Sequence, residues 1–261
     1  MKRIAAMAYG FVCYGAFFAT FLYAVGFLGN FYVPKSIDSG PEGSIALALL
    51  VDAGLLALFA LQHSIMARPW FKRAWTRIVP EPVERSTYVL LSSLALALMF
   101  WQWQPIGGVI WRIDSEVGQA MVFGLYAAGL LIVLLSTFLI NHFDLFGLRQ
   151  VFLYMIGRRY THLEFRTPFF YRYVRHPLYV GWLLTFWAAP VMTATHLFFA
   201  VMTTAYILIA IQFEEADLIT MHGARYREYR EQVPMIIPAL TANATGGARA
   251  VPEPERATAG D

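Results

Sequence analysis

The chain has 261 residues, of which 58% are hydrophobic and 14% are charged, and its formal net charge is +3. A soluble domain of this size carries roughly a quarter charged residues, so the composition excludes an ordinary soluble protein and indicates an integral membrane protein. The single cysteine, Cys13, excludes a disulfide framework and a cysteine-based zinc site. We expect no metal ion, and the small, unevenly distributed charge argues against a nucleic-acid partner.

Apolar runs divide the chain into membrane segments. A bilayer crossing takes about 20 residues, and four runs approach or exceed this length: 4–28, 44–66, 87–103 and 117–140. Two further runs, 178–191 and 197–213, are separated by Pro190 and by the small polar set Thr193-Ala194-Thr195, which is typical of a tight helical hairpin. We therefore predict an all-α, polytopic membrane bundle of about six transmembrane helices. Its last two helices form a hairpin, followed by a cytoplasmic amphipathic helix.

The distribution of basic residues supports six spans. Eighteen of the 20 Lys and Arg residues fall in the N-terminus, the second and fourth connections and the C-terminal tail. The positive-inside rule then places both termini in the cytoplasm. We expect one membrane domain over residues 1–240. The tail, 241–261, is rich in Ala, Gly, Pro and Glu and is predicted to be disordered.

The segment Arg175-His176-Pro177 lies at the start of the fifth apolar run. Proline disfavours helix in the residue before it and suits the first helical position, so the spacing predicts a helix that begins near Pro177. The free amide groups of such a helix start attract anions, and Arg175 adds a fixed positive charge. The alternative is a basic turn beside phospholipid headgroups.

Two carboxylates, Glu214 and Glu215, end the sixth apolar run. If the helix continues, Glu215, His222, Tyr226 and Tyr229 fall on one stripe, which could hold a cation or a ribose-like diol. The alternative is a solvated amphipathic helix on the membrane surface. Because a hairpin joins the two segments, we expect them to face each other.

Histidines close the second and fourth runs. His142 and Asp144 lie where a general base would be useful, since imidazole titrates near neutral pH; they could equally cap a helix end. His63 ends the second run, where a lone histidine is more often a structural hydrogen-bonding group. The sequence contains no HExxH, CxxC, GxxxxGK[ST] or strand-linked GxGxxG motif, which excludes zinc-protease, redox, P-loop and Rossmann readings.

The pattern R-H-P-x-Y-x-G followed by E-E-x-x-L-x-x-x-x-G-x-x-Y-x-x-Y, over about residues 165–238, resembles the isoprenylcysteine carboxyl methyltransferase superfamily. The upstream segments 61–68 and 141–150 resemble those of bacterial methanethiol S-methyltransferases, which make dimethyl sulfide. The resemblance implies a multi-pass enzyme of the bacterial inner membrane that takes S-adenosylmethionine as methyl donor and a small volatile thiol as acceptor.

The resemblance also implies roles for single residues. The cofactor site is expected to comprise Arg175, His176, Tyr179, Gly181, Glu214, Glu215, Tyr226 and Tyr229. His142 with Asp144 is the expected base that deprotonates the thiol. Other acceptors remain open, namely a prenylcysteine, a phospholipid amine or another small thiol. A small transporter or a noncatalytic membrane subunit is the alternative of another class, and the oligomeric state is not predicted.

Overall fold

The computed structural model describes residues 1–41, 43–161 and 163–238. Its elements are, in chain order, α1 (Lys2–Gly29), α2 (Ile45–Ala67), α3 (Pro69–Trp75), α4 (Glu81–Gln102), β1 (Val109–Arg112), α5 (Glu116–Ile140), α6 (His142–Leu145), α7 (Leu148–Met155), the 3-10 helix η1 (Phe169–Arg172), α8 (Pro177–Trp187), β2 (Val191–Thr193), α9 (Ala194–His222) and α10 (Ala224–Gln232). The predicted disordered tail, 241–261, lies outside the described residues. The assignment of residues 1–240 to one domain remains a prediction.

Five helices are long and apolar enough to cross a membrane: α1, α2, α4, α5 and α9. They confirm the predicted polytopic helical bundle. The fifth predicted span, 178–191, differs, because α8 has only 11 residues, which is about 16 Å of helix and half of a bilayer core. Pro190 cannot continue a helix, and residues 191–193 form the short strand β2 instead. The fifth pass is therefore part helix and part extended chain.

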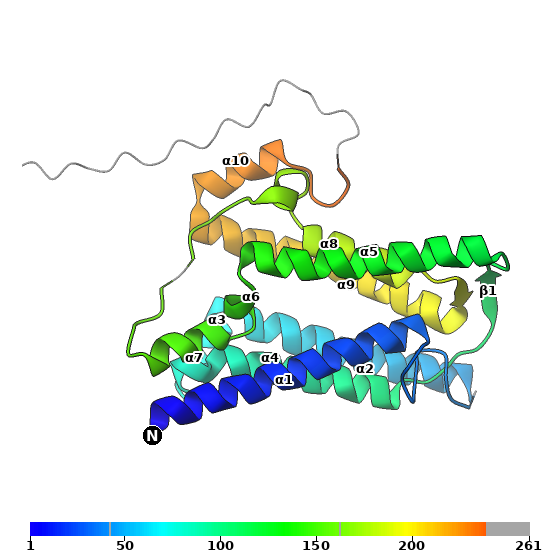
Figure 1. Cartoon of the computed structure of the whole chain (residues 1–261), viewed down its shortest axis with the longest axis horizontal. Helices are drawn as coiled ribbons and strands as arrows, with labels where there is room; N and C mark the ends of the chain where they lie inside the picture. The colour runs from blue at the N-terminus through cyan, green and yellow to red at the C-terminus, as the bar shows by residue number, and fades with distance from the viewer. Residues whose placement is uncertain (42, 162, 239–261) are drawn as a thin grey trace, which may run out of the picture.

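A two-stranded antiparallel sheet, which the sequence did not predict, closes one end of the bundle. Val109, Trp111 and Arg112 of β1 pair with Thr193, Met192 and Val191 of β2, respectively. The sheet joins the α4–α5 connection to the α8–α9 connection, so both connections lie at the same end. The amino terminus and α10 lie at the other end (Figure 1).

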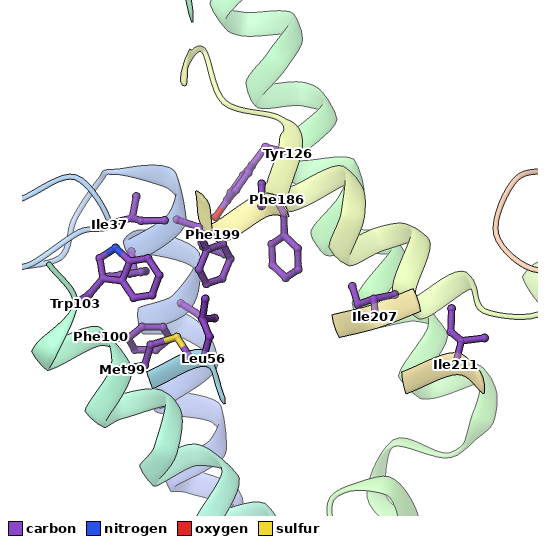
Figure 2. Close-up of a cluster of buried hydrophobic side chains, with 14 residues drawn as sticks. Ile37, Leu56, Met99, Phe100, Trp103, Tyr126, Phe186, Phe199, Ile207 and Ile211 are labelled. Carbon is purple, nitrogen blue, oxygen red and sulfur yellow. The ribbon is translucent and has the colours of Figure 1, made fainter. Parts of the chain in front are cut away.

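The helices form two groups (Figure 1). In one group α4 packs against both α1 and α2, with α7 beside α1 and α4; in the other group α8 packs against both α5 and α9. A buried cluster joins the groups, and Figure 2 shows Phe100 of α4 and Trp103, the residue after α4, near Phe199 of α9 and Phe186 of α8. Trp103 and Phe199 meet edge to face with ring centroids 5.6 Å apart, a geometry that aromatic pairs favour.

Small residues allow α5 and α8 to approach closely. A Cβ atom on Gly181 would lie 2.6 Å from the carbonyl oxygen of Gly129, and one on Gly129 would lie 2.6 Å from Oγ1 of Thr185. Neither helix could keep its position with a side chain there. Close packing through small residues is a common means of helix association in membranes.

The C-terminal helical segment is broken at Gly223. This residue has φ 60° and ψ −128°, a conformation that glycine adopts readily and other residues do not. The condition stated for the stripe, a helix that continues from Glu215 to Tyr229, is therefore not met. The separate helix α10 follows the break and turns back toward α8, as the strap contacts described below show. Helix α10 lies after the hairpin, at the position where we predicted an amphipathic helix.

Candidate functional site

The site begins at the start of α8, where the structure confirms the prediction from the Arg-His-Pro segment. His176 is the N-cap residue and Pro177 is the first residue of the helix. The backbone N–H groups of Arg175 and His176 donate to the carbonyl oxygens of Pro234 (2.9 Å) and Met235 (3.2 Å). Residues 233–236, which we term the C-terminal strap, are thus fastened across the residues that precede α8.

A buried ion pair connects α8 to α9. Nε of Arg175 donates to Oε1 of Glu215 at 2.7 Å, and the two side chains are only 10% and 7% exposed. The same oxygen lies 3.1 Å from Nε2 of His176, and Oε2 lies 3.8 Å from Nη1 of Arg230. Glu215 is therefore surrounded by positive or hydrogen-bonding groups, which compensate its charge.

Arg175 also holds the end of α10. Its Nη1 donates to the carbonyl oxygens of Arg230 (2.9 Å) and Val233 (2.6 Å). These contacts use Nε and Nη1, and among the described residues they leave only Nη2 of the guanidinium without a hydrogen bond. The sequence placed Arg175 as a carboxylate ligand, and that role remains a prediction. The structure adds a positioning role, because Arg175 links α8, α9 and the strap.

Glu214 contrasts with its neighbour Glu215. The Tyr179 hydroxyl donates to its Oε2 at 3.0 Å, and its side chain is 43% exposed with Nδ1 of His176 at 3.8 Å. No lysine or arginine forms an ion pair with it among the described residues. Glu214 is thus an accessible, uncompensated carboxylate beside a phenol ring, and such a group favours a cationic ligand.

An aromatic cluster forms around Phe165, a residue that the sequence did not single out. The Phe165 ring centroid lies 5.1 Å from that of His222, 5.7 Å from that of Tyr226 and 5.4 Å from that of Tyr229. The members of the predicted stripe therefore meet despite the break at Gly223. Burial raises the pKa of Tyr226 and of Tyr229, so both phenols are uncharged near neutral pH.

The predicted base, His142, is the first residue of α6 and is buried. Its Nε2 lies 2.8 Å from the Tyr14 hydroxyl and its Nδ1 lies 2.8 Å from Oγ1 of Thr137. Burial lowers the pKa of His142, so the imidazole is neutral near pH 7. Asp144 instead pairs with Arg149 at 2.9 Å. Its backbone N–H donates to Asn141, which caps α6.

Gly181, the remaining predicted ligand, lies in the α5–α8 contact described above. Its part in cofactor binding stays a prediction. An apolar pocket of about 280 Å³ lies nearby, on the side of α8 toward η1 and α5, with Ile132, Phe170, Val174 and Pro177 among its lining residues. Two of its lining residues, Val174 and Pro177, flank Arg175 and His176 in the sequence.

A second group of polar side chains comes from both halves of the bundle. The sequence singled out only His63 among them, because Tyr88 and Tyr206 each lie singly within an apolar helix. The Tyr206 hydroxyl of α9 lies 3.0 Å from Oγ of Ser64 of α2. The Tyr88 hydroxyl of α4 lies 3.0 Å from Nδ1 of His63. The Phe59 ring of α2 links the two pairs, because its centroid lies 5.2 Å from that of His63 and 6.4 Å from that of Tyr206.

Comparisons with known proteins agree with the architecture. A family profile described as phospholipid methyltransferase matches residues 120–225. The chain is 60% identical over 238 residues to a methanethiol S-methyltransferase of Crocosphaera subtropica, covering 91% of this chain and 93% of the relative. It is 52% identical to methanethiol S-methyltransferase 2 of Bradyrhizobium diazoefficiens, covering 97% of each chain.

A third relative is the methanethiol S-methyltransferase of Mycobacterium tuberculosis, which is 49% identical over 91% of this chain and 98% of its own length. No solved structure matches the chain. The three matches cover 91%, 97% and 91% of the chain, rather than a single motif. The chain therefore belongs to the methanethiol S-methyltransferase family.

Proposed function

We propose that this chain transfers a methyl group from S-adenosylmethionine to methanethiol, giving dimethyl sulfide, at the cytoplasmic edge of a bacterial inner membrane. The observation that carries the proposal is the 60% identity to a methanethiol S-methyltransferase over 91% of the chain. The basic residues support the orientation, because the end of the bundle that holds Arg68, Arg85, Arg175 and Arg230 is the end expected to face the cytoplasm.

The side chains at the site suit this methyl donor. When bound, S-adenosylmethionine supplies a methyl group on a positively charged sulfur. Glu214 is an exposed carboxylate without a lysine or arginine ion-pair partner among the described residues, and the Tyr179 ring lies beside it. Glu214 would bind the ammonium or the ribose hydroxyls, while Nη2 of Arg175 and the first-turn amides of α8 would bind the carboxylate.

Catalysis then rests on positioning and on proton removal. The methyl acceptor must be a thiolate, so the thiol proton passes to a base while the sulfur keeps the electron pair that forms the new carbon–sulfur bond. The methyl–sulfur bond of the donor would break in the same step, and its electron pair would stay on the departing thioether sulfur. His142 is neutral and can accept a proton, either directly or through the Tyr14 hydroxyl 2.8 Å away. Asp144 supports it indirectly by ordering α6 through Arg149 and Asn141.

A second acceptor is supported by one specific observation. The profile that matches residues 120–225 is described as phospholipid methyltransferase, so a phospholipid amine is the alternative acceptor. The apolar pocket beside Pro177 could accommodate part of an acyl chain. A methanethiol acceptor needs no such pocket, because this small apolar molecule can reach the site through the bilayer.

The test is headspace gas chromatography on cells that express the chain and receive methanethiol, with Glu215→Ala as the inactive control. Dimethyl sulfide from the wild type and not from the variant supports the proposal. Methylated phospholipid in the lipid extract, without dimethyl sulfide, would identify a phospholipid amine rather than methanethiol as the acceptor. Neither product, with the protein present in the membrane, would contradict the proposed enzyme activity.

A further inference from the structure

Three phenol side chains from three different helices converge between the two halves of the bundle. Tyr88 comes from α4, Tyr179 from α8 and Tyr206 from α9. The Tyr206 ring centroid lies 6.4 Å from that of Phe59 on α2, and the Tyr88 ring centroid lies 5.3 Å from that of His63 on the same helix. The hydroxyl of Tyr179 is committed to Glu214 at 3.0 Å. The Tyr88 hydroxyl comes from the opposite half of the bundle, whereas the Tyr206 hydroxyl comes from α9, in the same half as α8.

Helix α2 fixes the two remaining hydroxyls. Oγ of Ser64 lies 3.0 Å from the Tyr206 hydroxyl, and the two ring nitrogens of His63 lie 3.0 and 3.1 Å from the Tyr88 hydroxyl. Phe59 stacks on His63 with ring centroids 5.2 Å apart. Two neighbouring residues of α2 therefore position the two hydroxyls, and this fixes the hydroxyls relative to each other.

The surroundings of these hydroxyls are positively charged. Arg85 lies over the Tyr88 ring with its Cζ 4.8 Å from the centroid, and both Arg68 and Arg85 interact electrostatically with His63 and Tyr88. Arg68 is paired with Asp217 at 2.8 Å. The described residues contain no ion-pair partner for Arg85, so one positive charge is left uncompensated there.

The position along the membrane also matters. Tyr206 precedes Glu214 by eight residues on α9, which places its backbone about 12 Å deeper in the bundle. The donor-binding groups lie at the cytoplasmic edge of the bundle. The hydroxyls of Tyr88 and Tyr206 lie further toward the membrane interior. An apolar acceptor that arrives through lipid would meet the hydroxyl pair first.

We propose that the hydroxyls of Tyr88 and Tyr206 bind the sulfur of the acceptor thiol and stabilise its thiolate form. His63 and Ser64 are positioning residues that orient the two hydroxyls, and Arg85 supplies the positive field that favours the anion. Arg85 also donates from Nε to the carbonyl oxygen of Leu145 at 2.8 Å, the last residue of α6. This hydrogen bond links the proposed acceptor subsite to α6, the helix that begins with the proposed base His142. This inference rests on the proposed function.

The test uses Tyr206→Phe and Tyr88→Phe in purified full-length protein in lipid nanodiscs. Each substitution keeps the ring and removes one hydroxyl. A hydrogen bond to a charged group contributes about 1.5–3 kcal/mol, so we expect the KM for methanethiol to rise by about ten- to a hundredfold. The Kd for S-adenosylmethionine, measured by calorimetry, should stay within about twofold of the wild-type value.

The matched control is Tyr23→Phe, which removes a hydroxyl that donates to the Lys35 carbonyl at 2.9 Å near the sheet end of the bundle. It should change neither constant. Ser64→Ala removes a partner of the Tyr206 hydroxyl and leaves the phenol in place. It should raise the KM for methanethiol by a few fold with kcat unchanged, and it serves as the test if a tyrosine variant does not fold.

The outcomes separate this inference from the proposed function. A weakened Kd for S-adenosylmethionine in Tyr206→Phe or Tyr88→Phe would assign the hydroxyls to the donor site and overturn the inference. An unchanged KM for methanethiol in these variants and in Ser64→Ala would also overturn it. A wild-type protein that forms no dimethyl sulfide under the same conditions would contradict the proposed function itself.

Discussion

Replacement of Glu215 by Gln tests how the donor site is held together. Glu215 accepts from Arg175 at 2.7 Å and lies 3.1 Å from His176. The variant keeps the shape of the side chain and removes its charge. Removing one partner of a buried ion pair costs about 3–5 kcal/mol, because the other charge stays buried without compensation. Arg175 is 10% exposed, so little of this cost is relieved by solvent.

The cost should appear in donor binding rather than in unfolding of the whole bundle. Arg175 also holds the carbonyl oxygens of Arg230 and Val233, so its displacement releases the C-terminal strap. Since each 1.4 kcal/mol corresponds to a factor of ten in an equilibrium constant, the Kd for S-adenosylmethionine should rise by about a hundredfold or more. Calorimetry on protein in nanodiscs measures this change directly.

The control for this experiment is Glu164→Gln. Glu164 pairs with Arg166 at 3.4 Å, and the two side chains are 80% and 78% exposed. Exposed pairs of this kind contribute about 0–1 kcal/mol, so the Kd should not change measurably. A Glu215→Gln variant whose Kd stays within threefold of the wild type would refute the argument that the buried pair organises the donor site.

Three further predictions concern packing, pH and catalysis. Gly129→Ala places a Cβ 2.6 Å from Thr185 and should destabilise the protein by about 1–3 kcal/mol, whereas Gly124→Ala on the same helix meets nothing within 4 Å and should not lower the unfolding temperature. Burial lowers the pKa of His142, so its contribution to stability is present above about pH 6.5 and is lost as the pH falls; His142→Gln should flatten this part of a pH–stability curve. His142→Ala should lower kcat by about 10²–10⁴-fold and Asp144→Ala by less, and an unchanged rate of dimethyl sulfide formation in both variants would remove the base assignment.

The sequence contained enough information to predict the membrane architecture and the part of the site at the start of α8. Hydrophobic run length and the placement of basic residues gave the spans, and Pro177 gave the start of α8 to the residue. These features depend on local composition and on backbone restrictions of proline, so they need no knowledge of tertiary contacts.

The remainder depends on long-range contacts that the sequence does not display. The extended chain that follows Pro190 pairs as β2 with β1, about 80 residues away in the chain. The strap contacts of Arg175 and the convergence of Tyr88, Tyr179 and Tyr206 join separate helices. The break at Gly223 was missed because a glycine inside a polar helical pattern is often tolerated, and its positive φ becomes evident only in the structure.

The most direct test of the account is methyl transfer by the purified protein from S-adenosylmethionine that carries a trideuteromethyl group. With methanethiol as acceptor and mass-spectrometric detection of the headspace, the account predicts dimethyl sulfide that contains one labelled and one unlabelled methyl group. Glu215→Gln should abolish the signal at a donor concentration that saturates the wild type. Unlabelled dimethyl sulfide alone, or none with folded protein that binds the donor, would contradict the assignment of this chain as the methanethiol methyltransferase.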